Sequence, residues 1–154
     1  MAVENSLNLA EDDIFKPYSL EEVIQKRLKD CTLNSDGTYS CEGNVDLSGL
    51  GLIVLSVKFK EVKGYFDCSN NYLTSLEGGP KEVGKCFWCN NNNLTALKGA
   101  PRKVGQDFNC MYNKLTSLEG APEKVGREFS CSDNPISAYE LKKNIKRSYL
   151  WNLL

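Results

Sequence analysis

A pattern of apolar and polar residues repeats every 21 positions through the middle of the chain. Three units align without a gap: FDCSNNYLTSLEGGPKEVGKC from Phe66, FWCNNNNLTALKGAPRKVGQD from Phe87 and FNCMYNKLTSLEGAPEKVGRE from Phe108. A fourth begins FSCSDNPIS at Phe129 and then departs from the pattern. The Phe and the Cys of each unit are two positions apart, so they point to the same side of a strand. We therefore predict a solenoid in which Phe packs on Phe, Cys on Cys and Leu on Leu.

An earlier unit fits the same frame with plain aliphatic residues. The positions equivalent to the Phe, Cys, Asn and two Leu of the later units hold Val45, Leu47, Leu50, Leu52 and Leu55. The full units close with Gly, Pro and Val, which turn the chain back. The returning arm is too short for a helix, so we predict extended or short 3₁₀ segments there. The array is predicted to cover residues 45–136.

Both ends of the array need caps, because an open solenoid end exposes apolar core. Ser19 and Glu22 form a capping-box pattern before an apolar helical stretch, and Asp36-Gly37 separates two strand-like runs and predicts a hairpin. These features predict an N-terminal cap over residues 18–44. Residues 1–17 carry no clear periodicity and are predicted to be mobile.

The C-terminal cap is predicted to be helical and to cover residues 137–154. Ser137 and Glu140 repeat the capping-box pattern. Leu141, Ile145 and Tyr149 then share one helical face, which we expect to cover the last repeat.

The units resemble the leucine-rich repeat, LxxLxLxxNxLxxL, with Phe and Cys at the first two strand positions. Their tail, LTSLEGAPxxV, is similar to the short bacterial subclass known from secreted effector ubiquitin ligases, and several small phage-encoded proteins share the FxCxxNxLTSLxGxP wording. The resemblance covers roughly residues 45–141. It implies an α+β repeat solenoid, a short leucine-rich-repeat array with a parallel β-sheet on its concave face. A scaffold of this kind serves many partners, so the resemblance constrains the fold more than the function.

Strand positions between the core residues should face the concave side. They are Asn44, Asp46, Ser48, Gly49, Tyr65, Asp67, Ser69, Asn70, Cys86, Trp88, Asn90, Asn91, Asp107, Asn109, Met111, Tyr112, Glu128, Ser130, Ser132 and Asp133. None of these positions holds Lys or Arg and five hold acids, while bases cluster in the returning arms. Aromatic residues and Met are enriched where proteins anchor a partner. The alternative is a solvated sheet of chance composition.

We interpret this face as a site for a basic protein surface. The residues predicted to carry the binding are Tyr65, Asp67, Trp88, Asn90, Asp107, Asn109, Met111, Tyr112, Glu128 and Asp133.

The seven cysteines are expected to be reduced, since the acidic N-terminus lacks a signal peptide's pattern and predicts a cytoplasmic protein. Cys31 and Cys41 could pair across the hairpin, and this stays open. The ladder cysteines are interpreted as buried apolar thiols. Stacked on strands about 4.8 Å apart they form a line, not the tetrahedron that zinc requires. Cys86 and Cys89 have metal or redox spacing, but they should point to opposite sides.

Composition argues against catalysis. The chain has no His, which removes the commonest general base and imidazole metal ligands. We therefore expect no enzyme activity, no metal, no cofactor and no small-molecule substrate. Lys plus Arg number 19 against 20 Asp plus Glu, so net charge gives no reason to expect nucleic-acid or membrane binding. The basic run KKNIKR is interpreted as a solvated helix face.

We predict a non-catalytic protein–protein interaction module. The phage resemblance suggests an inhibitor of a host protein, such as an anti-CRISPR or anti-restriction factor, acting in the host cytoplasm. The alternatives are a substrate-recognition module related to the effector ligases and a virion or assembly component. The partner, the oligomeric state and the role of residues 1–17 stay open.

Overall fold

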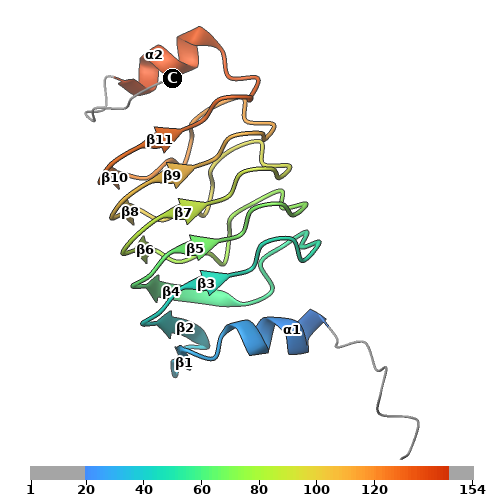
Figure 1. Cartoon of the computed structure of the whole chain (residues 1–154). Helices are drawn as coiled ribbons and strands as arrows, with labels where there is room; N and C mark the ends of the chain where they lie inside the picture. Colours follow the sequence, from blue (N-terminus) through green and yellow to red (C-terminus); the bar gives the residue numbers. More distant parts are fainter. Residues whose placement is uncertain (1–19, 146–154) are drawn as a thin grey trace, which may run out of the picture.

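The chain forms a repeat solenoid whose turns stack along one axis, as the computed structural model in Figure 1 shows. The structure describes residues 20–145. The first four turns each contribute one short strand to each of two sheets, and the last turn contributes a strand to the first sheet. The first sheet has the order β11-β9-β7-β5-β3. Its strands are β3 (Val45–Asp46), β5 (Phe66–Asp67), β7 (Phe87–Trp88), β9 (Phe108–Asn109) and β11 (Phe129–Ser130).

The predicted register of this sheet is confirmed. Phe66 pairs with Phe87, Phe87 with Phe108, and Phe108 with Phe129. Val45 pairs with Phe66, so the aliphatic opening unit also lies in frame. The stacking of turns in one direction makes every pairing parallel.

The returning arms form a second sheet, which the sequence analysis did not predict. Its order is β1-β2-β4-β6-β8-β10, in which β1 (Cys31–Leu33) and β2 (Thr38–Cys41) belong to the N-terminal cap. The arm strands are β4 (Lys58–Val62), β6 (Glu82–Val83), β8 (Lys103–Val104) and β10 (Lys124–Val125). The prediction of extended arms is confirmed, but the prediction of a single sheet on one face is wrong. Equivalent arm residues lie one above another, so their backbone groups pair, as Gly105 N–H does with the Val83 carbonyl (2.9 Å).

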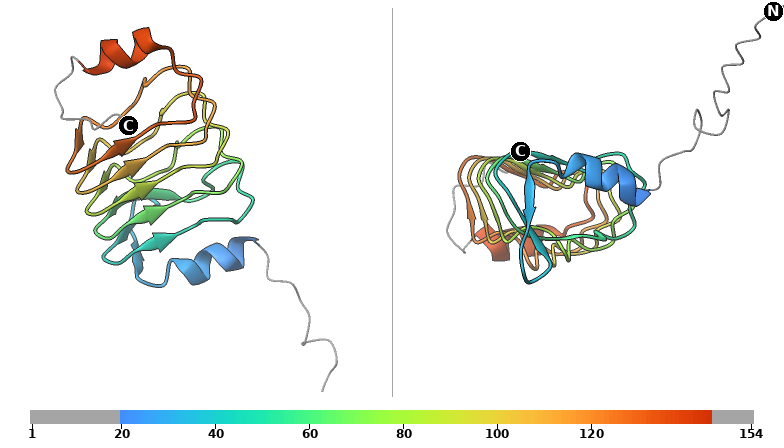
Figure 2. Two further views of the ribbon diagram at one scale, coloured as in Figure 1. Left: turned by 45° about the horizontal axis from the view of Figure 1, so that its top comes forward. Right: turned by 90° about the horizontal axis from the view of Figure 1, so that it is seen from below.

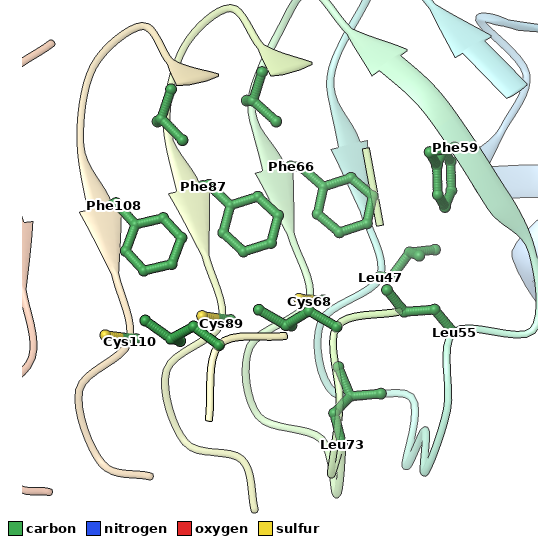
Figure 3. Packing of buried hydrophobic residues seen from close by; sticks show 14 of the residues in the cluster. Leu47, Leu55, Phe59, Phe66, Cys68, Leu73, Phe87, Cys89, Phe108 and Cys110 are labelled. Carbon is green, nitrogen blue, oxygen red and sulfur yellow. The ribbon is translucent and has the colours of Figure 1, made fainter. Parts of the chain in front are cut away.

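The interior between the two sheets is filled by ladders of identical side chains. Figure 3 shows Phe66, Phe87 and Phe108 side by side, with Phe59 beyond Phe66. Neighbouring rings of the ladder are nearly parallel, with centroids 5.0–5.4 Å apart. Aromatic pairs in such offset stacks contribute about 0.5–1.5 kcal/mol each beyond the area they bury. The predicted core of stacked Phe, Cys and Leu is thus confirmed.

An asparagine ladder satisfies the backbone where each turn bends. Asn92 Oδ1 accepts the N–H of Leu73 (2.9 Å), and its Nδ2 donates to the carbonyls of Cys68 (3.0 Å) and Cys89 (3.2 Å). Asn71 and Asn113 make equivalent bonds. One amide therefore supplies both a donor and an acceptor inside a bend that water does not reach.

The N-terminal cap consists of a helix and a hairpin. Helix α1 (Leu20–Arg27) lies against the first turn and buries Ile24, and Leu28 just after it is also buried (Figure 1). Strands β1 (Cys31–Leu33) and β2 (Thr38–Cys41) form the predicted antiparallel hairpin, with Gly37 in the left-handed region (φ 78°). Viewed along the axis, the hairpin lies at the end of the solenoid (Figure 2, right). Ser19 and the predicted mobile segment 1–17 lie outside the described residues.

Helix α2 (Ala138–Ile145) follows the last turn at the opposite end (Figures 1 and 2). Ser137 Oγ accepts the N–H of Glu140 (3.2 Å), which confirms this cap. Leu141 is partly buried against the core. The rest of the predicted helical cap, from residue 146, lies outside the described residues.

Two cysteines differ from the expectation of reduced thiols. Cys31 and Cys41 stand opposite each other in the hairpin and form a disulfide. The other five cysteines are free. The antiparallel register brings this pair together, which sequence spacing left open.

Candidate protein-binding face

The outward surface of the β3–β11 sheet, here called the outer face, carries the residues predicted to bind a partner. Asp46, Asp67, Trp88, Asn109 and Ser130 occupy equivalent positions on consecutive strands and are all half-buried. Their alternation with the buried Phe and Cys positions makes them point outward.

The preceding position of each turn forms a second row. Cys86, Asp107 and Glu128 each offer a backbone carbonyl to the Phe that begins the neighbouring strand. Asn44 begins this row and Tyr65 follows it. The Tyr65 ring lies 5.2 Å from that of Trp88, centroid to centroid, at an interplanar angle of 38°. The structure therefore brings together two aromatic residues that the sequence placed on different repeats.

The bend after each strand contains one residue in the left-handed region. These residues are Gly49 (φ 65°), Asn70 (54°), Asn91 (55°), Tyr112 (52°) and Asp133 (56°). Gly, Asn and Asp adopt this conformation readily, whereas a bulky side chain there is an outlier. Tyr112 is 53% exposed, and it takes the backbone conformation that this bend has in every repeat.

The outer face is less uniformly acidic than the sequence positions indicate. Arg27 of α1 reaches Asp46 (Nη1–Oδ1 3.2 Å), and Arg127 reaches Asp107 (Nε–Oδ1 3.6 Å). Both arginines come from outside the twenty predicted positions. Among residues 20–145, Asp67, Glu128 and Asp133 have no basic partner within ion-pair distance, so three uncompensated carboxylates remain.

Several polar residues of the face also have local structural roles. Asp46 Oδ1 accepts hydrogen bonds from the backbone (2.9 Å) and the hydroxyl (2.7 Å) of Ser48. Partial burial would raise the pKa of Asp46, but these bonds together with Arg27 outweigh it, and the pKa lies below its usual value. Asp67 and Asn109 accept equivalent backbone bonds from Ser69 (2.8 Å) and Met111 (3.0 Å).

Not every predicted position is accessible. Ser69 is only 5% exposed, so its assignment to the open surface is wrong. The neighbouring Asn70 amide donates to its hydroxyl (3.1 Å). Asn90 and Met111, at the equivalent positions of the next turns, are half-buried.

Three exposed apolar side chains of the first two repeats were missed. Ile53 and Val54, 65% and 62% exposed, replace the Thr-Ser or Thr-Ala of the later units. Tyr72 is 62% exposed, and its N–H donates to the Leu52 carbonyl (2.8 Å), which places it beside that segment. Comparing the opening unit with the others position by position would have identified this departure.

The ladder cysteines and Cys86 lie as predicted, on opposite sides of the strands. Cys68, Cys89 and Cys110 are fully buried, and burial raises the pKa of each thiol above its ordinary value. Cys86 is half-buried, with Sγ 3.4 Å from Gln106 Oε1, so it points away from Cys89. Within the described part of the chain, no cluster of three or more His, Cys, Asp or Glu is arranged to hold a metal ion.

No described helix is long and apolar enough to cross a membrane. No protein-family model, curated protein or solved structure matches the chain.

Proposed function

We propose that the chain is a non-catalytic interaction protein that holds a basic protein surface on its outer face. Tyr112 carries this proposal. A left-handed backbone costs an ordinary L-residue about 1–2 kcal/mol, and Asn at the two preceding equivalent bends avoids most of that cost. Strained residues that the surrounding structure holds in place cluster at functional sites. Tyr112 is therefore interpreted as a contact residue.

The surroundings of Tyr112 suit a basic partner. Trp88 and Tyr65 offer an aromatic pair on neighbouring turns, and such residues give much contact area for little loss of conformational entropy. The uncompensated Asp67, Glu128 and Asp133 lie on the same surface. Charges of one sign around an aromatic centre favour association with a surface of opposite sign.

We further propose that the protein is an inhibitor encoded by a phage or prophage. This part of the proposal rests on the sequence pattern of the repeats alone. A basic channel in a nuclease that binds nucleic acid would be a complementary target, because an acidic surface competes for the same electrostatic contacts. In this proposal the protein acts in the cytoplasm of the host.

Tyr112→Asn is the sharpest test, because it removes the aromatic contact while relieving the backbone. The full chain and the variant are immobilised and exposed to a bacterial lysate, and bound proteins are compared at several salt concentrations. We expect the wild type to retain a basic protein that Tyr112→Asn and Trp88→Ala release. Tyr139→Ser is the control, since Tyr139 is 73% exposed on α2, away from this face. Equal retention by all variants would exclude the outer face as the binding site.

A further inference from the structure

Charge is segregated between the two sheets of the solenoid. The outward residues of β4, β6, β8 and β10, the residue before each of the last three strands and the corner after each strand are here called the basic face. Its basic residues are Lys58, Lys60, Lys63, Lys81, Lys85, Arg102, Lys103, Lys124 and Arg127, and its acids are Glu61, Glu82 and Glu123. Nine bases against three acids on one sheet contrast with the near-zero net charge of the chain.

Two of the three acids are already neutralised on this face. Glu123 accepts two hydrogen bonds from Arg102, both 2.9 Å. Glu61 pairs with Lys63 at 3.3 Å. Glu82 is the remaining acid.

Six lysines of the basic face have no ion pair within residues 20–145. They are Lys58, Lys60, Lys81, Lys85, Lys103 and Lys124, and all six are exposed. Lys103 and Lys124 stand at equivalent positions of β8 and β10, and Lys81 lies two turns from Lys124. Neighbouring strands are about 4.8 Å apart, so the ammonium groups lie close together, with Glu82 beside Lys103 as the one acid of this face that has no ion pair in the described part of the chain. Mutual repulsion among these ammonium groups is relieved when a polyanion binds.

The surface between these lysines is open to close approach. Gly84 and Gly105 follow the buried valines of β6 and β8, and a Cβ at either would collide with the carbonyl oxygen of the turn before. A hollow of about 180 Å³ beside these glycines is lined by Lys63 and Lys103 and also by Glu61 and Glu82. The hollow therefore holds charges of both signs, and the exposed lysines around it are the groups that would contact phosphate.

We propose that the basic face binds the phosphate backbone of double-stranded nucleic acid without reading its sequence. A duplex is favoured over a single strand because the outward residues of β4, β6, β8 and β10 include no aromatic side chain, and single strands are held largely by stacking on aromatics. Lysines that act as point charges suit phosphate contacts, which carry no base information. The balanced net charge gave no reason to expect nucleic-acid binding, because it averages the outer face and the basic face.

The test measures binding of the full chain to a labelled 20-base-pair duplex of random sequence by fluorescence anisotropy at several NaCl concentrations. Contacts with about four phosphates predict a slope of about −3.6 in log affinity against log salt. Lys81→Gln combined with Lys103→Gln should reduce the slope by about two, because each lost phosphate contact removes about one. A single strand of the same composition should bind more weakly.

The matched control is Lys114→Gln combined with Lys142→Gln, which changes net charge equally at exposed positions on a bend and on α2. This pair should leave the slope unchanged. The proposal fails if no binding occurs at 50 mM salt, if both pairs have the same effect, or if polyglutamate binds more tightly than the duplex. Salt-sensitive self-association with no duplex binding would instead assign the basic face to the outer face of a second copy. Tyr112→Asn should not alter duplex binding, so failure here and failure of the proposed function are distinguishable.

Discussion

The ladder of buried thiols should make the fold sensitive to alkali. Cys68, Cys89 and Cys110 are each 0% exposed, and burial raises the pKa of their thiols above the ordinary value of 9.0. In the unfolded chain these thiols ionise as the pH passes about 9, whereas in the folded chain they keep their protons. The folded state then binds more protons than the unfolded state, so the free energy of unfolding must fall as pH rises.

The magnitude follows from the proton count. For one thiol that ionises near pH 9 only when unfolded, raising the pH from 8 to 10 lowers the free energy of unfolding by about 1.4 kcal/mol. Three such thiols together give about 4 kcal/mol. Domains of this size are commonly stable by only about 5–15 kcal/mol, so the loss is a large fraction of the total.

Urea unfolding followed by circular dichroism at pH 8 and pH 10, in deoxygenated buffer, measures this loss. In Cys89→Ala one of the three thiols is removed, so the loss between the two pH values should shrink to about 3 kcal/mol. The variant is less stable at pH 8, but only the pH difference is compared. Equal stability of the wild type at both pH values, or an identical loss in Cys89→Ala, would refute the reasoning.

Three further predictions concern the parts that join one turn to the next. Gly105→Ala should lower the free energy of unfolding by at least about 2 kcal/mol, because its Cβ would collide with the neighbouring backbone. Gly49→Ala should lower it by about 1 kcal/mol, because its Cβ meets nothing within 4 Å and only the left-handed backbone is strained. Thermal melts of both variants compare the steric loss with the backbone loss. Asn92→Ala should lower the free energy of urea unfolding by about 3 kcal/mol, because three backbone groups in a buried bend lose their partner, and a loss below 1 kcal/mol would show that water replaces the amide. Reducing the disulfide should lower stability by about 2–3 kcal/mol for a loop of 10 residues, and Cys31→Ser should show no further loss when a reductant is added.

The repeat could be read from the sequence because its determinants are local. The two-residue spacing of Phe66 and Cys68 fixes which side chains point inward, and the 21-residue period fixes which of them stack. The Ser137 cap and the Asp36-Gly37 turn likewise depend on residues a few positions apart. Local geometry of this kind needs no knowledge of the neighbouring turns.

The remaining features depend on contacts between distant residues. The returning arms can pair only if each arm lies directly above the arm of the turn before. The pairing of Val83 with Val104 shows that they do, and it becomes visible only when the turns are stacked. Arg27 reaches Asp46 across 19 positions because α1 lies against the first turn.

The sequence by itself thus determined the solenoid, its register and the side of each strand residue, because side-chain direction alternates along a strand. Only the tertiary structure decided the second sheet, the disulfide, the strained Tyr112 and the ion pairs that neutralise Asp46 and Asp107. Those features depend on how closely distant residues approach one another, and a periodic sequence does not fix that distance.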